Sequence, residues 1–299
     1  MGSLTGRVAI VTGAGRGLGR EHALLLAAEG AKVVVNDSGV AGDGQGTDES
    51  PAHQVVAEIR AAGGQAVADT GRVDDFAAAG ALVDRAVATF GELNVLVNNA
   101  GITRDATVAT MTEQQWDSVI SVHLKGHYAM LHHAAAHWRR RAKAGHSVKA
   151  SVINTSSGSG LRGNPGQLNY AAAKAGIAAM TVVAARELER YGVRVNSIAP
   201  VARTRMTLNT PGLAAKLGSR EGEFDTWDPA NVSPLVAWLA AENCLANGQM
   251  LMIRGGRIDV YEGWTVRETH EHEGRWTSAD LDLALAALPS SAPPLVPSL

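Results

Sequence analysis

Three side chains in the middle of the sequence have the chemical types and the spacing of a proton-transfer site. Tyr170 and Lys174 are four residues apart, which places a phenol and an ammonium on one face of a helix. A free phenol has a pKa of about 10. A neighbouring ammonium favours the phenolate, so we expect Lys174 to lower the pKa of Tyr170 toward neutrality. Ser157 follows a predicted strand, where its hydroxyl can orient an alcohol or carbonyl oxygen.

A second group of residues has the pattern of a dinucleotide-binding loop. The segment Thr12–Gly19 follows a short apolar run and opens a helical stretch. Glycine permits a tight turn and a close approach of the backbone to a pyrophosphate, and the helix N-terminus presents free N–H groups. In this segment we expect cofactor contacts from Gly13, Arg16, Gly17, Leu18 and Gly19.

The choice between NAD and NADP depends on two charged residues near the adenosine ribose. Asp37 ends the second predicted strand, where a carboxylate accepts hydrogen bonds from the ribose hydroxyls and repels a 2′-phosphate. Arg16 opposes this reading, because a guanidinium near the ribose can pair with that phosphate. We weight Asp37 more heavily, so NAD is the expected cofactor and NADP the less favoured one.

Short β-branched runs alternate with longer stretches rich in Ala and Leu, which indicates βαβ units. Near-continuous apolar strands are typical of a parallel sheet covered on both faces. The sequence therefore predicts an α/β fold with a doubly wound, Rossmann-like parallel sheet. The expected strands are 8–11, 32–36, 66–69, 95–98, 151–155, 194–198 and 250–253. The expected helices are 18–29, 52–62, 77–90, 113–138 and 169–191.

The last part of the chain loses this alternation. We expect a single Rossmann domain over residues 1–257 and a C-terminal extension over 258–299. Within the extension, residues 279–288 have an apolar helical pattern, and the Pro-rich end from Pro289 predicts a flexible or extended tail. A polar stretch rich in Gly and Asp, residues 38–51, predicts a long loop after the second strand.

Over residues 5 to about 257 the chain resembles the short-chain dehydrogenase/reductase family. The resemblance rests on the glycine loop, the Ser157/Tyr170/Lys174 set, Asn98-Asn99-Ala100-Gly101 and Asn196–Pro200 followed by Thr204. It implies a dehydrogenase that interconverts a secondary alcohol and a ketone. It also implies that Lys174 binds the nicotinamide ribose as well as tuning Tyr170. Further cofactor contacts implied by the family are Asn98, Ala100, Gly101, Tyr170, Pro200 and Thr204.

Three positions depart from the family pattern. His123 stands where an asparagine usually holds a water molecule for a proton relay, so it is either a relay group or a structural residue. Arg72 replaces an aspartate that often meets the adenine amine, although Val73 can still contribute its backbone N–H. Val201 replaces a glycine that commonly follows Pro200.

Within the family the chain is most similar to the (3R)-hydroxyacyl-CoA dehydrogenase unit of peroxisomal-type multifunctional enzymes and its bacterial single-domain relatives. Shared features include Val34–Asp37 with the long loop that follows, and Val122–Gly126. This implies oxidation of 3-hydroxyacyl-CoA to 3-oxoacyl-CoA, with a hydroxysteroid or a steroid-derived acyl-CoA as the alternative substrate. Residues 206–224 are expected to form a mobile flap over an apolar substrate pocket.

Two readings from other functional classes stay open. A dinucleotide-binding sensor without catalysis keeps the same fold. Metal binding by His270-Glu271-His272-Glu273 is disfavoured, because the two histidines do not share one helical face. We therefore expect no metal site.

The bulk properties limit the partners and the location. A net charge of −2 gives no field that would attract nucleic acid or anionic lipid. No apolar stretch is long enough to suggest a membrane span, and the single cysteine fits a reducing cytoplasm. Family members commonly pair through their long helices, so a homo-oligomer, dimer or tetramer, is expected. The extension carries Trp264 and Trp276 and is a candidate to cross to a partner subunit.

Overall fold

The computed structural model describes residues 2–40, 48, 50–208, 217–218, 222–263 and 265–288. Within them, eight strands form one sheet in the order β3-β2-β1-β4-β5-β6-β7-β8. Every neighbouring pair is parallel except β7 and β8, which are antiparallel. The strands are β1 (Val8–Thr12), β2 (Lys32–Asn36), β3 (Gln65–Asp69), β4 (Val95–Asn98), β5 (Ala150–Thr155), β6 (Val193–Pro200), β7 (Met250–Arg254) and β8 (Arg257–Tyr261).

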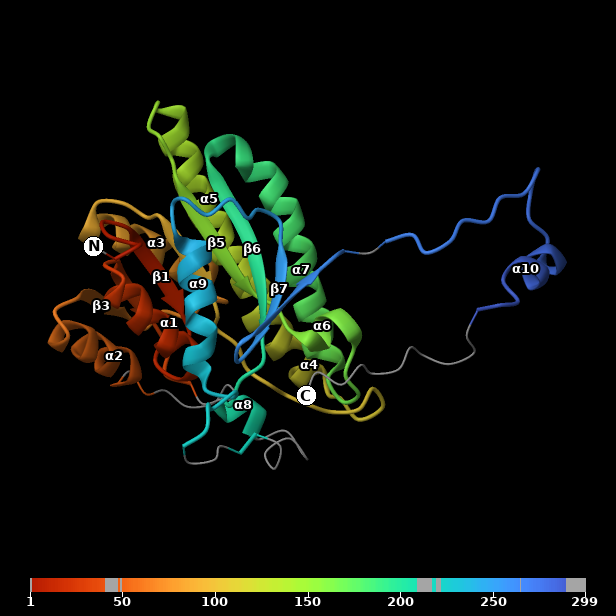
Figure 1. Ribbon diagram of the computed structural model, residues 1–299, viewed down its shortest axis with the longest axis horizontal. Coiled ribbons are helices and arrows are strands. Elements are labelled where there is room, and N and C mark those ends of the chain that lie inside the picture. The colour runs from red at the N-terminus through yellow and green to blue at the C-terminus, as the bar shows by residue number, and fades with distance from the viewer. Residues whose placement is uncertain are drawn as a thin grey trace.

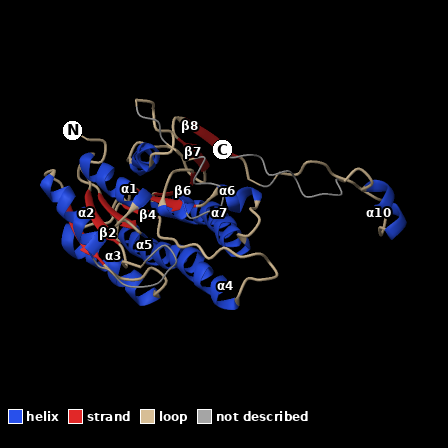
Figure 2. Ribbon diagram, turned by 90° about the horizontal axis from the view of Figure 1, so that it is seen from below, coloured by secondary structure: helices blue, strands red, loops and turns tan. Residues whose placement is uncertain are grey.

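Helices cover both faces of the sheet (Figures 1 and 2). One hydrophobic core packs α1, α2 and α9 on one face, and a second packs α3, α5 and α7 on the other. The α-helices are α1 (Gly17–Ala28), α2 (Ser50–Ala61), α3 (Phe76–Phe90), α4 (Glu113–Ile120), α5 (Gly126–Lys143), α6 (Gly158–Arg162), α7 (Leu168–Leu188), α8 (Arg205–Leu208), α9 (Ser233–Ala240) and α10 (Ser278–Ala284). Short 3₁₀ turns lie at Glu189–Tyr191 and Pro229–Val232.

This architecture confirms the predicted doubly wound sheet. All residues of β1, β4 and β5 are buried, which explains why these strands are apolar throughout instead of alternating. The strand order reverses between β1 and β4, so the connections that leave their carboxyl ends turn in opposite directions. A crevice opens at such a switch point, and this is where doubly wound folds bind their ligands.

The predicted helix over 113–138 is divided in the structure. Helix α4 is followed by a π-helical turn, η1 (Ser121–Lys125), which continues into α5. The Gly126 N–H reaches back five residues to the Ser121 carbonyl, as a π-helix requires. The extra residue in this turn sets the direction in which His123 points, and π-turns inside α-helices occur frequently at functional sites.

Helix α7 is the one helix among the described residues that is long and apolar enough to cross a membrane by length and composition. It carries Tyr170 and the buried Lys174 and packs against β6, which is the position of a core helix.

The extension contains a strand that was not predicted. Strand β8 pairs with β7 along the edge of the sheet, so the sheet continues to Tyr261. Beyond it the chain leaves the body as an arm that ends in α10 (Figure 1). No side chain of α10 is buried. The residues from Pro289 onward, and Trp264, lie outside the described part of the chain.

Candidate active site

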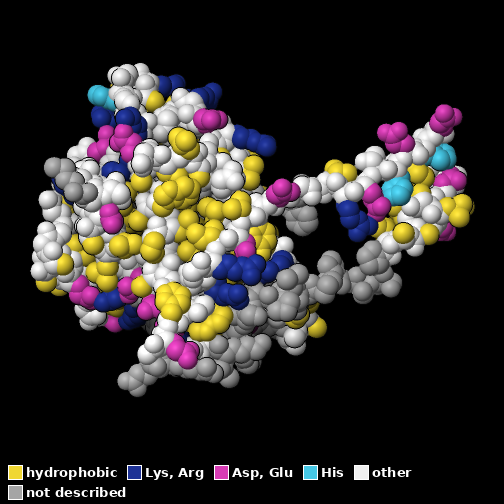
Figure 3. Space-filling view, viewed as in Figure 1, with side chains coloured by type: hydrophobic (Ala, Val, Ile, Leu, Met, Phe, Trp, Pro, Cys, Tyr) yellow, Lys and Arg dark blue, Asp and Glu magenta, His cyan; other side chains and the backbone are white. Residues whose placement is uncertain are grey.

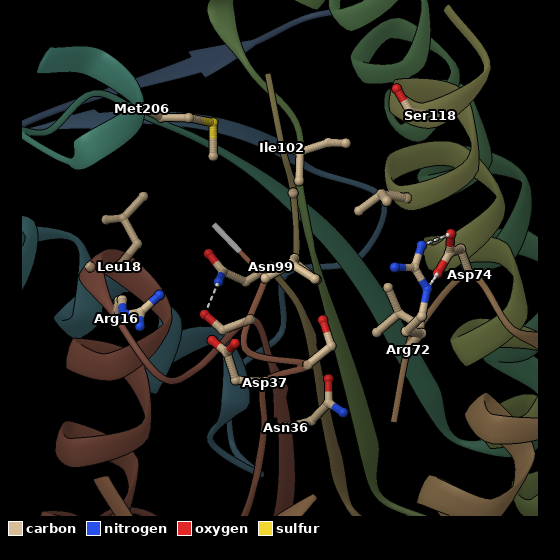
Figure 4. Close-up of a pocket in the computed structure, with 18 of the residues that line it drawn as sticks. Arg16, Leu18, Asn36, Asp37, Arg72, Asp74, Asn99, Ile102, Ser118 and Met206 are labelled. Carbon is tan, nitrogen blue, oxygen red and sulfur yellow. Dashed lines mark hydrogen bonds and ion pairs between the residues drawn. The ribbon is translucent and has the colours of Figure 1, made fainter. Parts of the chain in front are cut away.

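A cavity of about 310 Å³ lies at the carboxyl ends of β1, β2 and β4. Figure 4 shows Arg16, Leu18 and Asp37 on one side of it and Arg72, paired with Asp74, on the other. Its lining includes ten of the predicted cofactor contacts: Gly13, Arg16, Gly17, Leu18, Asp37, Arg72, Val73, Ala100, Gly101 and Thr204. The remaining predicted contacts, among them Tyr170 and Lys174, are not part of this lining.

The glycine loop is shaped for close backbone approach. A β-carbon on Gly19 would lie 2.2 Å from the Gly13 carbonyl oxygen, and one on Gly13 would lie 2.7 Å from the Ala100 Cα. The Asn99 side-chain amide donates to the carbonyls of Thr12 and Gly13 at 3.0 and 3.1 Å and holds the turn in place. Helix α1 begins at Gly17 without a side-chain cap, so its first N–H groups are available to an anion.

Asp37 lies beside this loop and is already hydrogen-bonded to it. Its two carboxylate oxygens accept from the backbone N–H groups of Gly15 and Gly39, each at 2.8 Å. The Arg16 guanidinium turns to Asp48, 3.1 Å away. Arg16 is thus paired with a carboxylate, and Asp37 presents its own carboxylate on the side where the ribose is expected.

The side of the cavity where the adenine is expected is formed by residues after β3. Arg72 makes two hydrogen bonds with Asp74, at 3.1 and 2.7 Å. Burial acts to raise the pKa of Asp74, but the hydrogen bonds and charge of Arg72 outweigh it and the pKa is lowered. Val73 is buried against Gly126, where a β-carbon would lie 2.9 Å from a Val73 methyl.

His123 is tied to the chain segment that follows β4. Its Nε2 lies 3.0 Å from the Ile102 backbone nitrogen and 2.7 Å from the Ile102 carbonyl oxygen. A β-carbon on Gly101 would lie 2.3 Å from the His123 ring, so only glycine fits at that position. Burial, with the Lys174 charge nearby, lowers the pKa of His123 well below its usual value. His123 is therefore neutral, and its ring is engaged with the Ile102 backbone.

The three proposed catalytic side chains come together from β5 and α7. Ser157 follows β5 and is the N-cap of α6, where its hydroxyl accepts from the Ser159 N–H at 3.2 Å. It also acts to lower the pKa of the Tyr170 phenol. The Lys174 ammonium lies 5.4 Å from the centre of the Tyr170 ring and donates to the Thr155 carbonyl at 2.6 Å. The His123 ring meets the edge of the same phenol, with the ring centres 5.2 Å apart.

The pKa values differ from the expectation drawn from spacing. Burial raises the pKa of Tyr170 to about 12; the Ser157 hydrogen bond acts against this rise and the Asp105 charge adds to it. Burial also lowers the pKa of Lys174 to about 7. The lysine alone therefore does not bring the phenol toward neutrality, because the low-dielectric surroundings act on both groups. An oxidised nicotinamide bound beside the phenol would add a positive charge that favours the phenolate.

The predicted cofactor contacts Pro200 and Thr204 lie at and just after the end of β6. Pro200 is the last residue of that strand, and the Val201 N–H that follows donates to the Ile253 carbonyl at 2.9 Å. Thr204 and Met206 line the cavity. Most of the predicted flap, residues 209–216 and 219–221, lies outside the described residues.

Several residues of the site had no clear signal in the sequence. Asp48 and Asp74 pair with the two arginines of the site, yet each lies in a polar stretch where a carboxylate is unremarkable. Asn99 stands out in the sequence only as part of the family motif, although its amide holds the glycine loop. His127 reads as an ordinary helical residue, and only the fold brings it close to Lys174.

The comparisons with known proteins agree with this geometry. A family model described as short chain dehydrogenase matches residues 7–211. The chain belongs to the short-chain dehydrogenase family. The predicted family and the predicted class of enzyme, an oxidoreductase acting on CH–OH groups, are thus confirmed.

Two curated relatives of this dehydrogenase are informative. It is 47% identical over 264 residues to hydroxyacyl-CoA dehydrogenase ChsB1 of Mycobacterium tuberculosis, covering 86% of this chain and 80% of that protein. It is 43% identical over 262 residues to peroxisomal multifunctional enzyme type 2 of Drosophila melanogaster, covering 88% of this chain but only 40% of that enzyme. The similarity to the multifunctional enzyme thus includes only part of that protein.

Solved structures support the same relationship. A short chain dehydrogenase from Mycobacterium avium superposes with a TM-score of 0.87 at 52% identity and covers 99% of both chains. The full-length multifunctional enzyme of Drosophila melanogaster gives a TM-score of 0.74 at 33% identity over 94% of this chain and 45% of that one.

Proposed function

We propose that this dehydrogenase oxidises a 3-hydroxyacyl-CoA to the 3-oxoacyl-CoA with NAD. The observation that carries the substrate class is the 47% identity, over most of both chains, to a hydroxyacyl-CoA dehydrogenase. The reaction type rests on the arrangement of Ser157, Tyr170 and Lys174 at the carboxyl end of β5 and on α7. An alcohol bound next to Ser157 lies within reach of one acid/base group and one orienting hydroxyl.

The chain fits a nicotinamide dinucleotide. Gly13 and Gly19 leave a cradle that a β-carbon would fill, the N-terminus of α1 can bind the pyrophosphate, and Asp37 can accept from the ribose hydroxyls. An ionised carboxylate has about four lone-pair positions, so the bonds from Gly15 and Gly39 leave acceptor capacity. When bound, the cofactor supplies the hydride acceptor.

The side chains of this dehydrogenase carry the proton chemistry. Ser157 orients the substrate oxygen through its hydroxyl, and the Tyr170 phenolate takes the hydroxyl proton. Lys174 holds positive charge beside the phenolate and favours it. We assign His123 to holding the Ile102 backbone beside the phenol, because its neutral ring is already engaged there.

Replacing Tyr170 by Phe tests this function. A 10²-fold to 10⁴-fold loss of turnover is expected, because that is the usual contribution of general acid–base catalysis. NADH production is measured with a series of 3-hydroxyacyl-CoAs and, in parallel, hydroxysteroids, each with NAD and with NADP. Binding of NADH and thermal unfolding of the variant serve as the controls for cofactor affinity and fold.

Turnover of 3-hydroxyacyl-CoAs with NAD by the unchanged protein supports the proposal. Turnover of hydroxysteroids alone would show that the substrate is a hydroxysteroid and not a 3-hydroxyacyl-CoA. A chain that binds NADH yet turns over neither class would favour the non-catalytic sensor, and unchanged turnover in Tyr170→Phe would remove the mechanism.

We also propose that the dehydrogenase is a cytoplasmic homo-oligomer. Its single cysteine, Cys244, is buried and has no second cysteine to pair with. Helices α5 and α7 expose Tyr128 and Val183 at 48% and 55%. Figure 3 shows apolar side chains on the front of the body and on the arm that carries α10. Exposed apolar surface of this kind supports association with a second copy.

A further inference from the structure

Asn169, the residue before Tyr170, has a buried side chain that the mechanism above does not use. It is 0% exposed and lies in the first turn of α7. A buried amide is tolerated where its hydrogen bonds are made, and those of Asn169 are made to three separate parts of the chain. The amide therefore joins the helix that carries Tyr170 to its surroundings.

One of these hydrogen bonds is made to the catalytic residue itself. The Asn169 Oδ1 accepts from the Tyr170 backbone N–H at 2.7 Å. The first N–H groups of a helix have no partner within the helix, and the N-cap residue of α7, Gln167, provides no side-chain cap. Asn169 supplies an acceptor for one of these groups, and the N–H that it takes is that of Tyr170.

The other two hydrogen bonds reach the wall of the cavity and α4. The Asn169 Nδ2 donates to the carbonyls of Arg104 and Gln115, each at 3.0 Å. Arg104 lines the cavity, and Gln115 belongs to α4. Both protons of the amide are used, so an inverted amide would place its oxygen against two carbonyl oxygens. One planar group thus connects the wall of the cavity to the backbone of Tyr170.

Neighbouring contacts hold the same segment after β4. The buried Gln167 donates through Nε2 to Asp105 at 2.9 Å, and the Ala106 N–H donates to the Gly166 carbonyl at 2.9 Å. Among the described residues, Asn169 is the one whose side chain bonds both to this segment and to Tyr170. The segment is therefore anchored beside α7, and Asn169 passes that anchoring to the catalytic residue.

We propose that Asn169 is a positioning residue for Tyr170. Its amide holds the phenol in a fixed place relative to the cavity, so that an alcohol beside Ser157 meets its proton acceptor and its hydride acceptor in one geometry. The inference rests on the proposed function in taking Tyr170 as the acid/base group.

Replacing Asn169 by Leu, which is similar in size, removes all three hydrogen bonds. We expect kcat to fall about 10-fold to 100-fold, because a misplacement of about 1 Å can cost that much. The KM for the alcohol and the Kd for NADH should change little, since the glycine loop and Asp37 are untouched. With deuterium on the carbon that loses the hydride, the isotope effect on kcat should rise as hydride transfer becomes slower than product release. Asn169→Ala is a second variant in case the Leu variant does not fold.

A second measurement reads the phenol without any substrate. The chain has four tyrosines, so NMR of protein labelled with ¹³C-tyrosine gives few ring resonances, and those of Tyr170 are assigned by their loss in Tyr170→Phe. We expect them to move in Asn169→Leu.

Asn94→Leu is the matched control for both measurements. The Asn94 Oδ1 also accepts from a backbone N–H, that of Val8 at 2.8 Å, but it does so just before the amino end of β4. The control should lower the thermal unfolding temperature and leave both kcat and the Tyr170 resonances unchanged.

A lower kcat with nearly unchanged KM and NADH affinity, together with moved Tyr170 resonances, supports the proposal. Unchanged kcat or unchanged Tyr170 resonances in a folded Asn169→Leu or Asn169→Ala protein overturns it, and so does an equal effect of Asn94→Leu. If the unchanged protein oxidises no 3-hydroxyacyl-CoA, the proposed function fails, while the Tyr170 resonances still decide whether Asn169 positions the phenol.

Discussion

The buried ammonium of Lys174 favours the reaction but lowers the stability of the fold. Its side chain is 2% exposed, and among the described residues no carboxylate forms an ion pair with it. Burial holds its pKa at about 7, against 10.5 for a free lysine. The folded protein therefore bears the cost of an ammonium in an apolar interior. This position favours the reaction because the same charge stabilises a phenolate next to it.

Replacing Lys174 by Met is expected to stabilise the fold and abolish turnover. Because the folded pKa is below the unfolded one, both states are protonated below about pH 7 and the cost of burial is complete. The cost fades as the pH rises from about 7 toward 10.5. The variant should gain about 1–4 kcal/mol in the free energy of unfolding at pH 6.5, and less at pH 9.5, as measured by urea denaturation.

The matched control for that experiment is Lys149→Met. Lys149 is 60% exposed and pairs with Glu242 on the surface, so its loss should change the free energy of unfolding by less than about 1 kcal/mol at either pH. An equal gain in Lys174→Met at both pH values would contradict the assignment of a depressed lysine pKa.

At the scale of elements, the site depends on how the segment after β4 meets the π-helical turn η1. His123 projects from this turn and holds the Ile102 backbone, while Gly101 leaves room for its ring. The close approach fixes the backbone of Ile102, which lines the cavity, and the same His123 ring meets the edge of the Tyr170 phenol.

A methyl group at Gly101 should therefore disturb both stability and activity. Gly101→Ala is expected to cost about 1–3 kcal/mol, because overpacking a filled interior forces side chains and backbone to shift. The smaller side chain of His123→Ala should relieve that clash, so the double variant is more stable than the sum of the single changes predicts. Thermal unfolding measures this coupling. Gly256→Ala is the control, since a β-carbon there meets open space; simple additivity would refute the contact.

The sequence predicts the elements that rest on strong local patterns. Continuous apolar runs predicted seven of the strands. The glycine loop predicted the cofactor half of the site, and the Tyr170/Lys174 spacing predicted the acid/base half. It did not predict β8, because Arg257, Asp259 and Tyr261 alternate with Ile258 and Val260 in a stretch too short and polar to stand out. The burial of His127 was also not predictable, because its helix lies against the sheet only in the folded chain.

The molecule consists of an α/β body with two hydrophobic cores and an arm whose helix α10 has no buried side chain. Helix α10 begins with a capping box formed by Thr277 and Asp280, yet it leaves Leu281 and Leu285 at 40% and 37% exposure. Capping specifies a helix start, but a short helix gains most of its stability from packing. In the proposed homo-oligomer, the arm is the candidate to pack against a second copy of the chain.

Removal of the arm should lower the oligomeric state. Because β8 pairs with β7, the chain is best ended after Glu262, which leaves the sheet complete. We expect the shortened chain to keep its thermal unfolding transition but to sediment with a smaller mass than the full chain. A Leu281→Asp, Leu285→Asp variant of the full chain should behave in the same way. An unchanged assembly and unchanged activity in both proteins would show that the arm is not an interface.

Asp37 has a consequence for any attempt to redesign cofactor preference. The carboxylate that disfavours a 2′-phosphate also ties Gly15 and Gly39 together through its two oxygens. A neutral or basic residue at this position would admit the phosphate and, by the same change, release the loop that binds the pyrophosphate. If NAD is the cofactor, as proposed, conversion to NADP requires at least two coordinated changes: one that accommodates the phosphate and one that restores the lost hydrogen bonds. Such coupling makes the cofactor choice resistant to single mutations.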